Sequence, residues 1–253
     1  MRAALAGGLA AGLMILAGAR APAWAQMPDT HDGHGGTTHE MMENIIIVHA
    51  VADKLEAWIG SGQNAFHWDT QGWIGNDYDK LWLKSEGNWP GGGRLEDGRY
   101  ELLYDRAISA YVDLQAGVRA DWDSGTGRGW AALGVRGLAP KFITYEATVY
   151  GSDQGHAAAR AAASVDILIT QRLILQPDIE VNFYSKADTG RAVGAGMADI
   201  DAGLRLRYEI GRKFAPYIGV VYAAKVGQTA RLAQREGESA GGLKFVFGIR
   251  SWF

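Results

Sequence analysis

The chain has 253 residues, of which 47% are hydrophobic and 21% charged, and its formal net charge is −3. This composition excludes a disordered or collagen-like chain, and the lack of an overall basic charge argues against a nucleic-acid partner. Cysteine is absent, which excludes disulfides, Cys-ligated metal sites and thiol nucleophiles, whereas 35 Gly, 9 Trp and 10 Tyr favour many strands over helices.

The first 25 residues have the pattern of an export signal. Arg2 gives a short positive start, an apolar run covers 3–19, and the sequence Ala-Trp-Ala at 23–25 fits a signal-peptidase site. The alternative is a membrane anchor, but the run is short and rich in alanine and glycine. We therefore predict a signal peptide over 1–25 and an exported mature chain.

A polar tail with a biased composition is predicted over 26–44. It contains three histidines and three methionines, namely His31, His34, His39, Met27, Met41 and Met42. Few of its residues could build a core, so a flexible periplasmic segment is expected. Imidazole and thioether groups are ligands that copper accepts, so the tail predicts binding of a copper ion. The alternative is a solubilising linker whose histidines have no function.

The rest of the chain, 45–253, alternates with a period of two. Between 112 and 122 every second residue is apolar, while the intervening ones include Asp113, Arg119 and Asp121. Similar runs of about 10–13 residues recur, roughly twice the usual strand length and enough to cross a bilayer at a tilt. The expected strands are 48–59, 64–75, 78–87, 98–107, 110–123, 128–138, 141–152, 156–168, 172–185, 198–210, 213–226 and 241–253.

Connection lengths favour a membrane barrel over a soluble β-sandwich. Five connections are very short, while 88–97, 186–197 and 227–240 are long. Short turns at one end, longer loops at the other, apolar strand faces ending in aromatic residues and an even strand number are typical of bacterial outer-membrane barrels. The predicted fold is therefore all-β: an antiparallel outer-membrane barrel of about twelve strands, surrounded by outer-membrane lipid, with a disordered N-terminal tail.

The polar strand faces should line the lumen, where the charged residues of both signs are expected to form mainly structural salt bridges. His67 lies on the same face as Asp69, and Glu56 is expected beside it on the neighbouring strand. An imidazole oriented by a carboxylate is a common way to build a metal site, so these three residues are candidate copper ligands. The alternative is a histidine that is simply hydrogen-bonded to a carboxylate. His49, at the start of the first strand, is close enough to the tail to contribute.

Several segments resemble the copper resistance protein B family. They are WDTQGWIGNDYDKLWLKSEG at 68–87, TQRLILQP at 170–177, GLRLRYEI at 203–210, FAPYIGV at 214–220 and the terminal strand. The resemblance implies an outer-membrane barrel that binds copper and assists copper tolerance, with a periplasmic multicopper oxidase of the same resistance system as partner. The family's N-terminal region is commonly rich in Met and His, whereas here it is short.

These features lead to one main functional hypothesis and two alternatives. The main hypothesis is a non-enzymatic protein that captures copper in the periplasm and then stores it, passes it to an oxidase or releases it through the lumen. The first alternative is a nonspecific diffusion pore or structural barrel. The second is an outer-membrane hydrolase, but no recognisable arrangement of nucleophile, base and orienting group supports it.

Overall fold

The computed structural model describes residues 45–60, 64–90, 96–123, 126–188, 191, 193–211, 213–235, 237 and 239–253. The predicted signal peptide (1–25) and His/Met tail (26–44) lie outside the described residues. Within the described part, no helix is long and apolar enough to cross a membrane.

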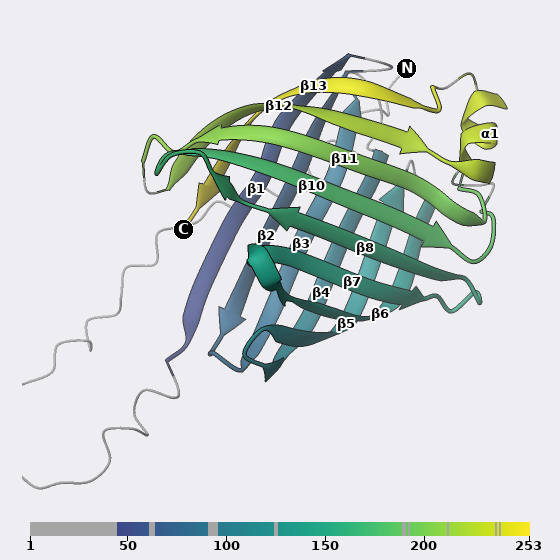
Figure 1. The fold of residues 1–253 in the computed structure, drawn as a ribbon. Helices are drawn as coiled ribbons and strands as arrows, with labels where there is room; N and C mark the ends of the chain where they lie inside the picture. The colour runs from purple at the N-terminus through teal and green to yellow at the C-terminus, as the bar shows by residue number, and fades with distance from the viewer. Residues whose placement is uncertain are drawn as a thin grey trace, which may run out of the picture. The chain divides into compact units, whose positions relative to one another are not determined.

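Twelve long antiparallel strands form a closed barrel (Figure 1). They are β1 (Ile47–Gly60), β2 (Ala65–Gly75), β3 (Asp79–Pro90), β4 (Glu96–Ser109), β5 (Val112–Asp123), β6 (Thr126–Ala139), β7 (Ile143–Gly151), β8 (Ala157–Val165), β10 (Leu173–Tyr184), β11 (Gly196–Tyr208), β12 (Phe214–Lys225) and β13 (Gly241–Trp252). Each strand pairs with its sequence neighbours, and β13 pairs with β1, which closes the ring and leaves no free edge. The predicted twelve-stranded barrel is confirmed.

Two details of the strand prediction are wrong. The expected strand 156–168 is interrupted at Asp166, and its remainder is the short β9 (Ile167–Leu168), which also pairs with β10. The interruption coincides with the Asp166 carboxylate accepting a hydrogen bond from Arg207 Nη2 on β11, 2.8 Å away. The expected loop 88–97 is shorter than predicted, because β3 extends to Pro90 and β4 begins at Glu96.

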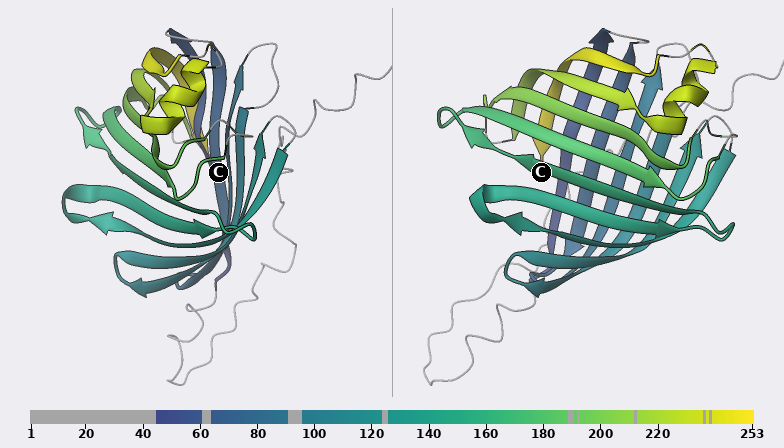
Figure 2. Two further views of the ribbon diagram at one scale, coloured as in Figure 1. Left: turned by 90° about the vertical axis from the view of Figure 1, so that its right-hand side faces the viewer. Right: turned by 45° about the vertical axis from the view of Figure 1, so that its right-hand side comes forward.

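The loop predicted over 227–240 contains a helix instead. Helix α1 (Gly227–Arg235) packs against β11 and β12 and buries Thr229 and Ala233, which are four residues apart on one face (Figure 2). Thr229 Oγ1 accepts a hydrogen bond from the backbone N–H of Gly194 at 2.9 Å. The helix escaped prediction because it is only nine residues long and has few large apolar side chains, although its polar and small residues follow a helical period.

The two ends of the barrel differ in the length of their connections. The connections β2–β3, β4–β5, β6–β7, β9–β10 and β11–β12 are short, and β1 begins and β13 ends at the same end as these turns. Backbone hydrogen bonds of 2.8 and 3.2 Å between Ala50 and Phe253 join the two terminal strands there. The longest connections lie at the other end. Bacterial barrels keep short turns in the periplasm, so we refer to the ends as periplasmic and extracellular.

The outer surface of the barrel is covered with large apolar side chains. Those exposed on the strands include Ile59, Phe66, Ile74, Leu83, Leu102, Val118, Val149, Leu204, Ile218 and Phe245. A soluble monomer rarely exposes an apolar band of this extent, whereas lipid requires one around a closed barrel. The exterior therefore matches the hydrocarbon region of a membrane.

A charge on this surface should destabilise the barrel according to its depth. Val118 lies near the middle of β5 and is 58% exposed. We expect Val118→Arg to cost about 2–4 kcal/mol of folding free energy in lipid, against about 0–1 kcal/mol for Leu138→Arg near the periplasmic end of β6. Urea titrations of folding into lipid vesicles measure both. Equal costs at the two positions would contradict the assigned lipid-facing surface.

Candidate functional site in the barrel lumen

The interior of the barrel is lined by charged side chains, as the polar strand faces predicted. Several are almost completely buried, including Glu56, Glu101, Asp105, Arg119, Arg205 and Arg207. Buried charges are tolerated when they are paired. Most of these charges have opposite charges within ion-pair distance, so the prediction that they form salt bridges is confirmed for the described strands.

Two of the cavities in the lumen are lined by residues that the structure describes. The first, of about 380 Å³, is lined by residues that include Asp53, Asp166 and Arg250, and we call it the periplasmic chamber. The second, of about 530 Å³, is lined by residues that include Asn88 and Thr229, and we call it the extracellular chamber. The lining residues that the two chambers share are Glu86, Arg99 and Glu180. The chambers therefore meet at the level of these three side chains.

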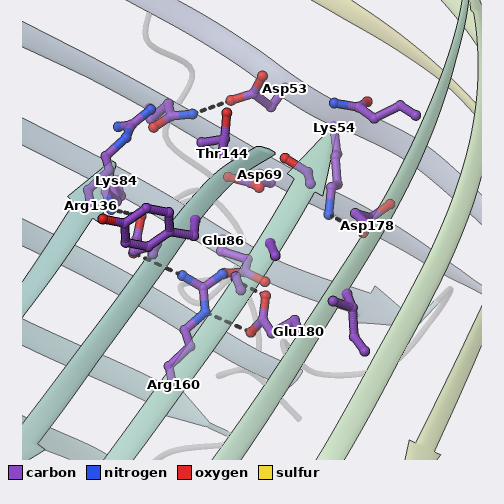
Figure 3. Close-up of a pocket in the computed structure, with 18 of the residues that line it drawn as sticks. Asp53, Lys54, Asp69, Lys84, Glu86, Arg136, Thr144, Arg160, Asp178 and Glu180 are labelled. Atoms are coloured by element: carbon purple, nitrogen blue, oxygen red, sulfur yellow. Dashed lines mark hydrogen bonds and ion pairs between the residues drawn. The ribbon is translucent and has the colours of Figure 1, made fainter. Parts of the chain in front are cut away.

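A network of ion pairs crosses the bore where the chambers meet. Arg160 on β8 donates to Glu180 on β10 at 2.6 and 2.7 Å, to Glu86 on β3 at 3.1 Å and to Glu146 on β7 at 3.4 Å. Arg99 on β4 approaches Glu86 at 3.3 Å and Glu180 at 3.5 Å. Figure 3 shows Arg160 directed between Glu86 and Glu180. We call these five residues the central belt; it lies where the two chambers meet.

A second buried network joins β11 to β1. Arg205 donates to the Glu56 carboxylate at 2.7 and 2.9 Å, and Trp58 Nε1 donates to the same carboxylate at 2.7 Å. Arg205 also bonds Asp178. Its side chain passes β12 and β13 at Gly219, its partner in register, and Gly248, the partner of Glu56. A Cβ on Gly248 would lie 2.5 Å from the Tyr217 ring and 2.7 Å from Glu56 Cβ, so the absence of a side chain at Gly248 leaves room for both Tyr217 and Glu56.

His67 is buried beside this network, and 5% of its surface is exposed. It lies opposite Glu56 in register, as expected, and its ring stacks on Trp58 with centroids 4.7 Å apart. Its Nδ1 is 2.9 Å from the amide oxygen of Asn88. The partner that orients the imidazole is thus an amide on β3, in place of the carboxylate considered in the sequence.

The candidate ligands Glu56, His67 and Asp69 come from adjacent strands, but they do not form a ready-made metal site. Both oxygens of Glu56 already accept hydrogen bonds from Arg205, and Asp69 lines the periplasmic chamber opposite Glu86 in register. In the described residues no group of three or more His, Asp or Glu side chains is arranged to hold a metal ion. Copper binding by these residues stays a prediction.

His49 lies at the periplasmic end of β1. It is opposite Trp73 in register, and the two ring centroids are 5.9 Å apart. The six candidate ligands of the tail, which are His31, His34, His39, Met27, Met41 and Met42, lie outside the described residues. The contribution of His49 to a site shared with them therefore also stays a prediction.

The comparisons with known proteins match one family over nearly the whole barrel. The family profile "Copper resistance protein B precursor (CopB)" covers residues 46–253. A "Copper resistance protein B" of Escherichia coli is 44% identical over 219 residues, which cover 87% of this chain and 73% of that protein. The chain belongs to the copper resistance protein B family. A "Copper resistance protein B homolog" of Pseudomonas syringae pv. tomato is 41% identical over 223 residues, or 88% of this chain and 75% of the homologue.

Membership of the copper resistance protein B family gives the chain a role in copper resistance. A NanC porin structure has a TM-score of 0.53 and 13% sequence identity to this chain, and the match covers 81% of this chain and 99% of the porin. That likeness supports the barrel fold alone. A closed barrel with an apolar exterior, in this family, is a protein of the bacterial outer membrane, as the sequence predicted.

Sequence reasoning missed an aromatic cluster on one wall of the lumen. Its buried members are Trp82, Leu103, Trp130, Ala132, Tyr150 and Ala158. Arginine side chains lie over it, with the Arg119 guanidinium 4.4 Å from the Tyr150 ring and that of Arg136 4.2 Å from the Trp82 ring. The available signal was sequence parity, because Trp82 shares the polar face of its strand with Lys80 and Lys84.

Proposed function

We propose that this outer-membrane barrel binds copper ions on the periplasmic side and contributes to copper resistance by capturing them there. The family supports the copper relation, and the observation that carries the location is the position of β1. This strand begins at the periplasmic end, so the preceding His/Met segment is attached there. Imidazole, thioether and carboxylate groups are ligands that can bind copper in the oxidising periplasm. The chain contains no cysteine, so it has no thiol ligand that could be oxidised there.

The central belt argues against a nonspecific diffusion pore. A wide barrel conducts freely when its lumen is open, but here ion pairs from β3, β4, β7, β8 and β10 meet across the bore. Copper would then leave the periplasmic chamber when the belt rearranges, or would stay bound on the periplasmic side. The proposal needs no catalysis by this chain, and a periplasmic multicopper oxidase is the proposed recipient of captured copper.

Copper titration of the purified protein tests the proposal. We expect the mature chain to bind copper stoichiometrically and a variant lacking 26–43 to lose most of this binding. His67→Phe retains an aromatic ring beside Trp58 but removes the imidazole. The control is His156→Phe, in the extracellular connection between β7 and β8. Isothermal calorimetry gives the stoichiometry. Copper binding that is undiminished without 26–43 would overturn capture by the tail, and its selective loss in His67→Phe would move the site into the lumen.

A further inference from the structure

Arg136 differs from the other arginines that face the bore. The arginines with carboxylate partners are Arg99, Arg119, Arg128, Arg160, Arg191, Arg205, Arg207 and Arg250. Arg136 has no hydrogen bond or ion pair with any residue in the described part of the chain, and its Nη1 is buried without an acceptor. A guanidinium offers five N–H donors, so this lack of partners needs an explanation.

The acidic neighbours of Arg136 are already engaged. In register it lies between Asp113 on β5 and Glu146 on β7. Asp113 is 3.9 Å from Lys80, and Glu146 accepts from Lys84 at 2.7 Å and from Arg160 at 3.4 Å. Arg136 therefore forms no ion pair of its own with the described residues, although its charge interacts with the carboxylates of Glu146 and Asp105.

The guanidinium of Arg136 is nevertheless fixed in place. Its centre lies 4.2 Å from the ring centroid of Trp82, and Lys84 Nζ lies 5.9 Å from the same centroid. Trp82 is 7% exposed and packs in the aromatic cluster, and its Nε1 is also a buried donor without an acceptor in the described residues. Arg136 and Lys84 line the periplasmic chamber, whereas Trp82 does not, so an acceptor in the chamber would meet the two cations that lie over the ring and not Trp82 Nε1.

The site opens on the periplasmic chamber. Arg136, Lys84 and Thr144 all line this cavity, and Figure 3 shows them on the same side of it. A volume of about 380 Å³ is sufficient for a small organic ion. A planar guanidinium with a fixed orientation matches a carboxylate through two parallel hydrogen bonds, and the Thr144 hydroxyl adds a neutral donor on the same side.

We propose that Arg136 is the centre of a binding site for a small carboxylate anion in the periplasmic chamber. The Trp82 ring holds the guanidinium, which donates to the carboxylate, while Lys84 adds positive charge nearby. The site is formed by residues of β3, β6 and β7, and of the candidate copper ligands Asp69 lines the same chamber. Binding of the anion at Arg136 is expected without copper. The site favours carboxylates over other anions in the periplasmic chamber. This preference is additional to any binding of metal by the protein.

Calorimetric titration of the full mature chain with sodium succinate at low ionic strength tests this site. We expect saturable binding to the wild type and at least about tenfold weaker binding to Arg136→Gln, the loss expected for charge-assisted hydrogen bonds. Arg136→Lys keeps the positive charge but loses the planar pair of N–H donors, so its affinity for succinate should lie between those of the wild type and Arg136→Gln. Arg106→Gln is the matched control, because Arg106 is exposed and pairs with Asp79 at the periplasmic end.

Circular dichroism and heat-modifiable gel migration show whether each variant folds, and Arg136→Lys covers the case in which Arg136→Gln does not. Equal succinate affinity in the wild type and in either folded Arg136 variant would overturn the proposal, as would the absence of saturable binding to the wild type. A parallel titration with inorganic phosphate checks the ligand class. Binding of phosphate without binding of succinate would overturn the assignment to carboxylates.

Discussion

Replacing Arg160 by methionine is expected to open the bore and raise its single-channel conductance several-fold. Arg160 contacts three carboxylates of the central belt, so its removal breaks the ion pairs that join β8 to β3, β7 and β10. The three carboxylates of Glu86, Glu146 and Glu180 then keep two of their cationic partners, Lys84 and Arg99. A bore with this negative excess should also prefer cations.

Planar-bilayer recordings under a salt gradient measure both effects, since the reversal potential gives the ion preference. Glu180→Gln offers an independent change to the same belt that keeps Arg160 in place, and it should raise conductance less. Arg106→Met is the control outside the lumen. A wild-type barrel that already shows a large, unselective conductance, or an Arg160→Met variant indistinguishable from it, would contradict a closed belt and favour the diffusion pore.

The strands and the faces they present could be predicted because a single rule governs both. Lipid outside and charge inside impose a period of two, and the run 112–122 obeys it without interruption. The rule fails at a β-bulge. The register shifts between Ala52 and Lys54, so that Asp53 and Lys54 both reach the periplasmic chamber, although strict alternation places only Lys54 inside.

The candidate site divides into parts that local sequence determines and parts that it does not. The tight turn between β2 and β3 sets their register, so the pairing of His67 with Asn88 could have been derived from the hairpin. The contacts of the central belt could not be derived from local sequence. Arg160 and Glu86 are 74 residues apart, and their contact depends on how the closed barrel places β8 across from β3. Alternation specifies that a side chain faces the lumen, but not which opposite charge it meets there.

The aromatic residues show the same limit. Interface positions were expected for them, because girdles of Trp, Tyr and Phe flank the lipid region of such barrels. Phe66 and Trp122 do lie on the outer surface, but Trp82, Trp130 and Tyr150 are buried inside. The interior aromatic residues pack along one wall of the lumen, and Arg136 stacks on Trp82 there. Composition alone therefore overestimated the fraction of aromatic residues that face lipid, and it gave no indication of this stacking.

Removing the Glu56 carboxylate should have the largest effect on stability. Glu56 is fully buried and accepts three hydrogen bonds, two from Arg205 and one from Trp58. Glu56→Leu leaves a buried guanidinium without its main partner, for which we expect a loss of about 3–5 kcal/mol. Urea titration in lipid vesicles gives this free energy, and Asp79→Asn at the exposed periplasmic rim should change it little.

A second variant separates a structural role of Glu56 from metal ligation. The double replacement Glu56→Leu with Arg205→Met substitutes apolar groups of similar size for both charges, and it should recover most of the lost stability. If Glu56 serves only to hold Arg205, the double variant also retains wild-type copper stoichiometry. Recovered stability with reduced copper binding would instead make Glu56 a ligand. A double variant no more stable than Glu56→Leu would show that the pair is not the reason for the loss, because Asp178 still approaches Arg205 in the single variant.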